Sequence, residues 1–168
     1  MGIEIERKFL LGSESWRTQV HRSEHIQDGL VAASDGRKTR VRIIGARATL
    51  TVKTQRVEGR RDEFEYDIPM ADAERLMECC GANVMQKVRH YIEHGGVTWE
   101  VDEYGGLLKG VILAEVEVSA LDQPLALPDW VGREVTAQLP YSKTNLLRSI
   151  QQRSSGIVAV PELLAPAS

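Results

Sequence analysis

Hydrophobic and charged residues alternate with a period of two along most of this chain. In residues 3–10, for example, Glu4, Glu6 and Lys8 fall on one side of an extended segment, whereas Phe9 falls on the other. Because successive side chains of a strand point to opposite faces, this pattern predicts a strand with one charged and one apolar face. The same alternation predicts strands over residues 38–44, 49–53, 63–68, 87–92, 99–104 and 114–118, and a weaker one over 25–31.

Two longer helices are predicted beside these strands. A helix over residues 72–80 would be capped by Asp72 and would end at Gly81. A second helix over residues 142–152 would be capped by Ser142. We expect both helices to cover outward-facing apolar sides of the sheet.

The remaining segments are connections. A short helix is predicted to start near Ser13 and to contain Trp16. The glycine-rich stretch 105–110 lacks the glycine-lysine-serine/threonine order of a P-loop, so it predicts a strand connection. We expect one domain over residues 1–152 and a C-terminal tail over 153–168.

The charged faces of the predicted strands are sorted by sign. Acidic residues occur in pairs two positions apart, and basic residues occur on other strands or at other positions of the same strand. The acidic pairs are Glu4/Glu6, Glu63/Glu65, Glu100/Asp102 and Glu115/Glu117, and the bases are Lys8, Arg40, Arg42, Lys53, Lys87 and Arg89.

These faces have two interpretations. A half-buried antiparallel sheet with one wetted face would explain each strand taken alone. A wetted face normally mixes Thr, Ser, Gln and Lys, however, and closing the sheet into a barrel would protect its edges. Charges enclosed by such a sheet need neutralisation, which a triphosphate with Mg²⁺ or Mn²⁺ would provide to bases and acids alike. We therefore expect a mainly β (α+β) domain with a charged interior.

Composition limits the possible partners. The 168 residues suit one domain, and a net charge of −3 gives no overall basic field for nucleic acid. The only two cysteines, Cys79 and Cys80, are adjacent, which predicts neither a disulfide framework nor a paired-cysteine zinc site. No long apolar run could span a membrane, and the first residues do not resemble a signal peptide. We expect a cytoplasmic protein with no nucleic-acid or membrane partner.

The charged motifs also follow one another in a characteristic order. After the opening Glu4-Ile5-Glu6-Arg7-Lys8 come Thr39-Arg40-Val41-Arg42, Leu50-Thr51-Val52-Lys53, Glu63-Phe64-Glu65, Lys87-Val88-Arg89, Trp99-Glu100-Val101-Asp102, Ala114-Glu115-Val116-Glu117-Val118 and Tyr141-Ser142-Lys143. This order resembles that of the CYTH family, the triphosphate tunnel metalloenzymes. The similarity runs over about residues 3–147, and the compact chain resembles the short bacterial members.

The resemblance implies a closed eight-stranded antiparallel β-barrel, a triphosphate tunnel, with a few flanking helices and one or two divalent cations (Mg²⁺ or Mn²⁺). It assigns phosphate binding to the bases, four of which (Lys8, Arg42, Lys87 and Arg89) would also stabilise charge in the reaction. The implied phosphate-binding set is Lys8, Arg40, Arg42, Lys53, Lys87, Arg89 and Lys143, the metal-binding set is Glu4, Glu6, Glu115 and Glu117, and the supporting acids are Glu63, Glu65, Glu100 and Asp102.

Our first functional hypothesis is metal-dependent hydrolysis of inorganic tripolyphosphate to pyrophosphate and phosphate, with a small anionic triphosphate as the partner. The alternatives are hydrolysis of an organic triphosphate such as thiamine triphosphate or a nucleotide, cyclisation of ATP to cAMP, and polyphosphate binding without turnover. An organic substrate would need aromatic stacking, and Tyr91 and Tyr104 are the few aromatic residues on the charged faces. His90 and His94 are four apart on a strand, which does not favour a zinc site. A homodimer is left open.

Overall fold

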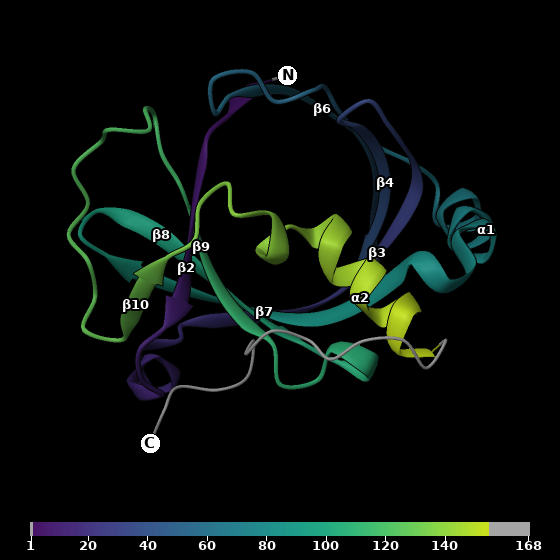
Figure 1. The fold of residues 1–168 in the computed structure, drawn as a ribbon. Helices are drawn as coiled ribbons and strands as arrows, with labels where there is room; N and C mark the ends of the chain where they lie inside the picture. Colours follow the sequence, from purple (N-terminus) through teal and green to yellow (C-terminus); the bar gives the residue numbers. More distant parts are fainter. Residues whose placement is uncertain (1, 155–168) are drawn as a thin grey trace. The chain divides into compact units, whose positions relative to one another are not determined.

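A computed structural model describes residues 2–154 of the 168-residue chain, and its ribbon is mainly strands with a few helices (Figure 1). These residues form two compact units. The first unit contains residues 2–5 and 24–87, and the second contains residues 6–23 and 88–154. No helix among them is long and apolar enough to cross a membrane. Nearly all of the predicted C-terminal tail lies outside the described residues.

Each unit combines strands with a single α-helix. The first holds β1 (Gly2–Glu4), β4 (Arg37–Ile44), β5 (Arg47–Lys53), β6 (Arg61–Asp67), α1 (Met70–Cys80) and the 3-10 turn η2 (Gly81–Asn83). The second holds β2 (Glu6–Leu11), η1 (Ser15–Gln19), β8 (Val97–Tyr104), η3 (Gly106–Leu108), β9 (Ile112–Glu117), β10 (Val131–Glu134), η4 (Leu139–Tyr141) and α2 (Lys143–Ser154). Strands β3 (Arg22–Ser34) and β7 (Val84–His94) each have residues in both units.

The strand order corrects one part of the predicted fold. The sheet has ten strands in the order β1-β6-β5-β4-β3-β7-β8-β9-β2-β10, and its described pairings are antiparallel. Within residues 2–154, β1 and β10 stand at the two ends of this order. The mainly β, antiparallel architecture is therefore confirmed, whereas the closed eight-stranded barrel is wrong in closure and in strand number.

One additional strand arises because the predicted first strand is divided at Ile5. Glu4 pairs with Arg61 of β6, whereas Glu6 pairs with Glu117 of β9. The alternation of side chains continues across this change of partner, so the hydrophobic pattern contains no sign of it. Ile5 itself is buried, with 4% of its surface exposed.

The other additional strand, β10, was not predicted. It has only four residues and pairs with β2 in an irregular register, with Val131 opposite Leu11 and Glu134 opposite Phe9. A bidentate ion pair supports it, in which Arg7 donates to the Glu134 carboxylate from Nε at 2.9 Å and from Nη2 at 2.6 Å. A strand this short has too few residues for a periodic pattern.

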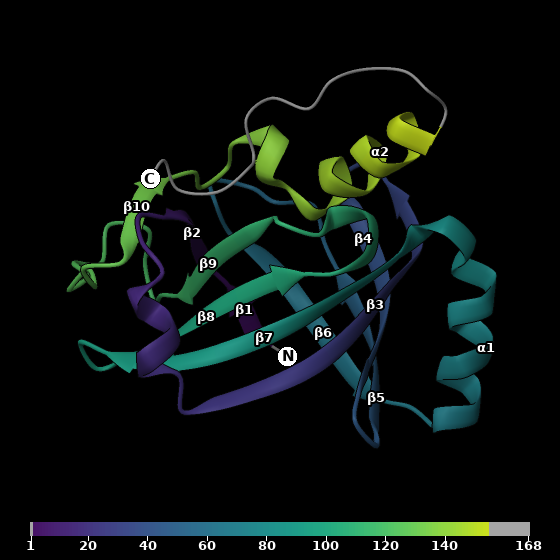
Figure 2. The ribbon, with the colours of Figure 1, turned by 90° about the horizontal axis from the view of Figure 1, so that it is seen from below.

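In the first unit, α1 lies along the strands, beside β3, β4 and β5 in both Figures 1 and 2. Val41 and Ala48 of the sheet form a buried cluster with Ala73 and Cys80 of the helix. The helix approaches so closely that a Cβ added to Gly29 would lie 2.8 Å from the Cys80 Sγ. The apolar face of these strands is thus covered by α1, as predicted, and the charged face lies on the opposite side.

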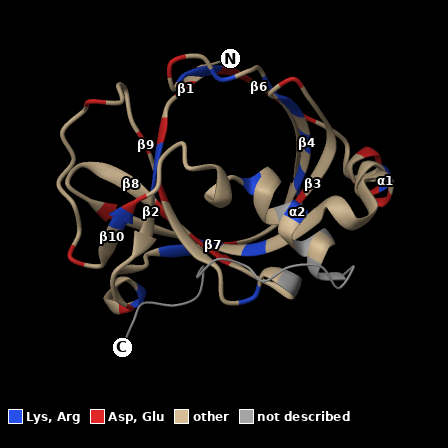
Figure 3. Ribbon diagram, in the orientation of Figure 1, with Lys and Arg blue, Asp and Glu red and all other residues tan. Residues whose placement is uncertain are grey.

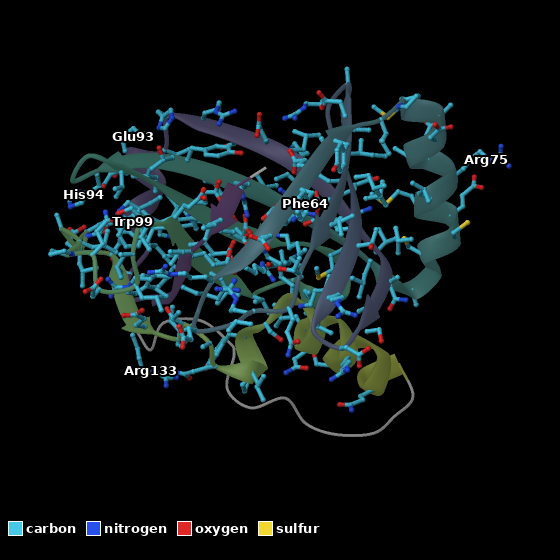
Figure 4. All side chains as sticks on the ribbon, turned by 90° about the horizontal axis from the view of Figure 1, so that it is seen from above. Phe64, Arg75, Glu93, His94, Trp99 and Arg133 are labelled. Atoms are coloured by element: carbon cyan, nitrogen blue, oxygen red, sulfur yellow. The ribbon has the colours of Figure 1, made fainter. Side chains whose placement is uncertain are left out.

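Helix α1 ends where the sequence predicts it but begins earlier than predicted. Gly81 ends the helix with a positive φ of 52°, which glycine adopts without steric cost. The N-cap is Pro69, whose carbonyl accepts the Ala73 N–H at 3.1 Å, and Asp72 lies inside the first turn instead of capping it. Farther along α1, the Arg75 side chain points away from the strands (Figure 4).

The second unit is built around aromatic residues. Phe9 packs against Trp99 with ring centroids 5.3 Å apart, and Trp99 packs edge-on against Trp130 at 5.6 Å. Both tryptophans are fully buried, and the Trp130 indole donates a hydrogen bond to Gln19. The predicted short helix is present as η1, and its Trp16 is also fully buried.

Helix α2 begins where the sequence predicts it. The Ser142 hydroxyl accepts the Asn145 N–H at 3.2 Å, which is the hydrogen bond of an N-cap serine. Leu146 is fully buried, as expected for the inner face. The other two residues expected on that face, 147 and 150, have side chains outside the described part of the structure.

Candidate functional site

Cross-strand pairing gathers the charged residues of the first unit on one face. Arg40 of β4 lies opposite Thr51 of β5, which lies opposite Glu65 of β6, and directly opposed residues share a face. Figure 3 shows both signs of charge along these strands. We define the first charge cluster as Glu4, Asp28, Arg40, Arg42, Lys53, Arg61, Glu63, Glu65 and Lys87.

Asp28 of β3 is the most deeply buried acid of this cluster, with 3% of its surface exposed. It accepts two hydrogen bonds from Arg42, Nε to Oδ1 at 2.6 Å and Nη2 to Oδ2 at 2.8 Å. The Nε of Arg40 and the Nζ of Lys87 each lie 3.9 Å from the same carboxylate. Burial would raise the pKa of Asp28, but Arg42 and then Lys87 and Arg40 hold it well below its usual value. Asp28 is therefore an ionised carboxylate beside three bases.

Arg40 is a largely buried cation with weak partners, and its side chain is 13% exposed. Its nearest carboxylate oxygens belong to Glu65 at 3.7 Å, Glu63 at 3.8 Å and Asp28 at 3.9 Å, all beyond hydrogen-bond distance. It donates one hydrogen bond from Nη2 to the Thr51 hydroxyl at 3.0 Å, and its buried Nε has no hydrogen-bond partner among the described residues. Burial lowers the pKa of Arg40, and the neighbouring charge of Arg42 lowers it further.

Glu4 is enclosed by bases in the first unit. Lys53 donates to its Oε1 at 2.8 Å, Arg61 donates to Oε2, and Arg56 lies 3.8 Å from Oε2. Burial would raise the pKa of Glu4, but the hydrogen bond from Arg61 and the charge of Lys53 hold it well below its usual value. Lys53 also contacts Glu63 at 2.7 Å, and burial lowers the pKa of this lysine.

A second charge cluster lies on the strands of the second unit. Glu115 of β9 pairs with Lys8 of β2 on one side and with Glu100 of β8 on the other, which places all three on one face. We define this second charge cluster as Lys8, Arg89, Glu100, Asp102, Glu115 and Lys143.

Arg89 is surrounded by carboxylates. It donates to Asp102 through Nε at 2.6 Å and Nη2 at 2.7 Å, and it also contacts Glu100 and Glu115. Burial would lower the pKa of Arg89, but the charge of Asp102 outweighs burial and raises it well above its usual value. Glu100 and Asp102, the two supporting acids expected to pair with a base or to help a second metal, both contact Arg89 in this structure.

Glu115 joins the bases of the second cluster. Lys8 lies 2.9 Å from its Oε1, while Lys143 and Arg89 lie 3.1 and 3.3 Å from its Oε2. Burial would lower the pKa of Lys143, but Glu115 raises it. The first residue of α2 therefore reaches the charged face through its side chain.

The carboxylates predicted to bind metal have different surroundings. Within residues 2–154, no three His, Cys, Asp or Glu side chains are grouped as a metal site. Glu4 and Glu115 are each paired with several bases. Glu6 and Glu117 are direct cross-strand partners, so two carboxylates share one face of β2 and β9. Oxygen donors of this kind suit a hard cation, and Mg²⁺ commonly uses only one or two protein carboxylates with phosphate and water.

All of the predicted bases belong to one of the two clusters. Sequence reasoning missed Asp28, Arg61 and Arg56. The sequence could have identified Arg61, because this residue is two positions before Glu63 and shares its face of β6. The sequence gives almost no indication of Asp28, because this residue is a single acid in the weakest predicted strand.

Comparison with known proteins agrees with this arrangement of motifs. The sequence model of the CYTH domain matches residues 2–150. The chain belongs to the CYTH family. This match covers both charge clusters and every residue predicted to bind phosphate or metal.

Individual relatives of this CYTH chain extend the comparison. An inorganic triphosphatase of Acetivibrio thermocellus is 33% identical over 150 residues, which cover 89% of this chain and 96% of the relative. A crystal structure of another inorganic triphosphatase is 28% identical, covers 86% of this chain and 97% of its own, and superposes with a TM-score of 0.64. A protein of Pyrococcus horikoshii, at 18% identity over 98% of this chain and 96% of its own and a TM-score of 0.55, shares the fold.

Proposed function

We propose that this chain is a divalent-cation-dependent inorganic triphosphatase that hydrolyses tripolyphosphate to pyrophosphate and phosphate. The observation that carries the proposal is the state of Arg40, a largely buried guanidinium without a close carboxylate partner among the described residues. The first charge cluster has five bases and four acids, so it retains an excess of positive charge. A buried base in this condition favours an anion rich in oxygen, because arginine binds phosphate through strong charge-assisted hydrogen bonds.

The substrate would be held mainly by the bases of the first cluster. Arg40, Arg42, Lys53 and Lys87 come from three strands and share one charged face, which suits an anion with several phosphate groups. The family assignment extends this role to the bases of the second cluster. Those bases are Lys8, Arg89 and Lys143.

A divalent cation, Mg²⁺ or Mn²⁺, would be held by Glu6 and Glu117. These two carboxylates lie opposite each other on one face of β2 and β9, and a cation bound between them would offset their mutual repulsion. Glu4 and Glu115, which the family resemblance also assigns to metal, here neutralise bases. We therefore propose that they support the site mainly through charge.

The reaction is the transfer of a terminal phosphoryl group to water. The water oxygen bonds to the terminal phosphorus as the bridging P–O bond breaks, and pyrophosphate leaves. When bound, the cation lowers the pKa of water and neutralises developing charge. The bases of the chain orient the phosphate oxygens and offset the charge that spreads over them, which is most of what phosphoryl transfer requires.

The aromatic residues support an inorganic substrate. Tyr104 retains 2% exposure and Tyr91 9%, and Arg22 lies over the Tyr91 ring at 3.8 Å. Both rings are packed into the protein and are poorly placed to stack on a nucleotide base or a thiazolium ring. Hydrolysis of an organic triphosphate, ATP cyclisation and binding without turnover remain the alternatives to be tested.

The test is a substrate panel with purified protein. Tripolyphosphate, ATP, thiamine triphosphate and pyrophosphate are each incubated with Mg²⁺ or Mn²⁺, and phosphate and cAMP are measured. We expect phosphate release to be fastest from tripolyphosphate and to require the cation. Faster release from ATP or thiamine triphosphate, formation of cAMP, or binding of tripolyphosphate without release would each replace the proposal with the corresponding alternative.

A further inference from the structure

Asp28 places a negative charge in the middle of bases that the proposed function assigns to phosphate. One carboxylate oxygen faces Arg42 at 2.6 Å and Arg40 at 3.9 Å, and the other faces Arg42 at 2.8 Å and Lys87 at 3.9 Å. Its side chain is only 4% exposed, compared with 21% for Glu63 and 38% for Glu65, the other acids near Arg40. Among the acids near Arg40, Asp28 is thus the one that is almost completely shielded from water, and it lies beside three bases.

The backbone beside Asp28 is closely packed against α1. The next residue, Gly29, faces α1, where an added Cβ would lie 2.8 Å from the Cys80 Sγ and 2.9 Å from the Met77 Sδ. Strand β3 is therefore packed tightly between the helix on one face and the charged cluster on the other. A carboxylate on a short side chain in this position cannot withdraw far when another anion approaches.

We propose that Asp28 is a built-in counter-anion that competes with phosphate for Arg40, Arg42 and Lys87, and thereby weakens the binding of substrate and products. This inference rests on the proposed triphosphatase function. In the absence of ligand, Asp28 lies beside all three bases and offsets the repulsion between them. When a polyphosphate binds, the fixed carboxylate repels it, and this repulsion promotes the release of pyrophosphate after the reaction.

The experiment compares Asp28→Asn with wild type and with Asp67→Asn. Asparagine keeps the shape of the side chain and removes its charge. Asp67 is a matched control because it lies on the same face of the sheet but is exposed and paired with the exposed Arg47. The dissociation constants of tripolyphosphate and pyrophosphate are measured by titration calorimetry in EDTA, which prevents turnover, together with the ligand-free melting temperature.

We expect Asp28→Asn to bind both anions at least about tenfold more tightly than wild type, since like charges a few ångströms apart repel strongly at a partly buried site. The ligand-free protein should melt at a lower temperature, and pyrophosphate should inhibit turnover at lower concentration. Asp67→Asn should bind both anions as wild type does. A lower melting temperature with unchanged or weaker anion binding would overturn the inference and assign Asp28 a structural role alone.

Two further outcomes remain decisive. If wild type does not bind tripolyphosphate, the proposed function fails and the inference fails with it; if wild type binds and Asp28→Asn is no tighter, only the inference fails. If Asp28→Asn does not fold, the double variant Asp28→Asn/Arg40→Gln is used instead, because it leaves fewer cations without a compensating acid. Its anion affinity is compared with that of the single variant Arg40→Gln. The double variant should bind about tenfold more tightly than the single one, and equal affinities would overturn the inference.

Discussion

Replacing Arg40 by Gln tests whether this arginine mainly stabilises the fold or mainly binds phosphate. In the ligand-free protein, Arg40 donates one hydrogen bond, to Thr51, and its nearest carboxylate oxygen is 3.7 Å away. A net hydrogen bond contributes about 0.5–1.5 kcal/mol to stability, and removing a poorly paired buried charge offsets part of that loss. We therefore expect the free energy of unfolding to change by no more than about 1 kcal/mol.

The effect on activity should be much larger. A hydrogen bond to a charged group contributes about 1.5–3 kcal/mol, so losing one between Arg40 and phosphate lowers kcat/KM by about ten- to a hundredfold. Loss of two such bonds would lower it further. The same variant should weaken tripolyphosphate binding in EDTA by a comparable factor.

The assay pairs urea unfolding with metal-dependent phosphate release from tripolyphosphate. Arg47→Gln is the matched control, because Arg47 also contacts Glu65 but is exposed and pairs mainly with Asp67. We expect Arg47→Gln to keep wild-type activity. A large loss of stability in Arg40→Gln with unchanged kcat/KM would show that Arg40 is a structural residue and does not bind phosphate.

Three further predictions follow from the same geometry. Gly29→Ala should lower the free energy of unfolding by about 1–3 kcal/mol in a urea titration, because its Cβ would overlap α1; wild-type stability would contradict the close contact. The pKa values of Asp28 and Glu4 in the folded protein lie below the ordinary 3.8 and 4.5. The ionised carboxylates therefore stabilise the fold above pH 4.5, and this stabilisation is lost as the pH falls below that value. A free energy of unfolding that stays constant from pH 5 to pH 2 would contradict this pH dependence. Glu6→Gln and Glu117→Gln should each abolish cation-dependent turnover, measured as phosphate release with Mg²⁺, and turnover that survives in both would count against a metal role. Glu4→Gln should lower the metal-free melting temperature in a calorimetric melt, because Lys53 and Arg61 lose their partner, and an unchanged melt would contradict that pairing.

The strands and their charged faces could be predicted because charged and apolar residues alternate along each strand. Alternation over residues 38–44 and 49–53 corresponds to β4 and β5, and the apolar positions of both strands pack beneath α1. The boundary at Gly81 was predictable for a similar reason, since a glycine with positive φ commonly ends a helix. These features depend on residues that are neighbours in the sequence.

Features that depend on distant residues were not predictable. The strand break at Ile5 comes from a change of partner between β6 and β9, and nothing in the local alternation reflects it. Asp28 is flanked on its own face of β3 by Ile26 and Leu30, so the strand does not show a charged face. Only the register of β3 with β4, which pairs Asp28 with Arg42, identifies this carboxylate as part of the cluster.

The most direct test of the central claim is phosphorus NMR of tripolyphosphate incubated with the protein and Mg²⁺. We expect the tripolyphosphate signals to disappear while pyrophosphate and phosphate accumulate in equal amounts, and we expect the pyrophosphate then to persist. The reaction should stop when EDTA is added. Tripolyphosphate that remains intact with Mg²⁺ or Mn²⁺, or pyrophosphate that is consumed as fast as tripolyphosphate, would contradict the account.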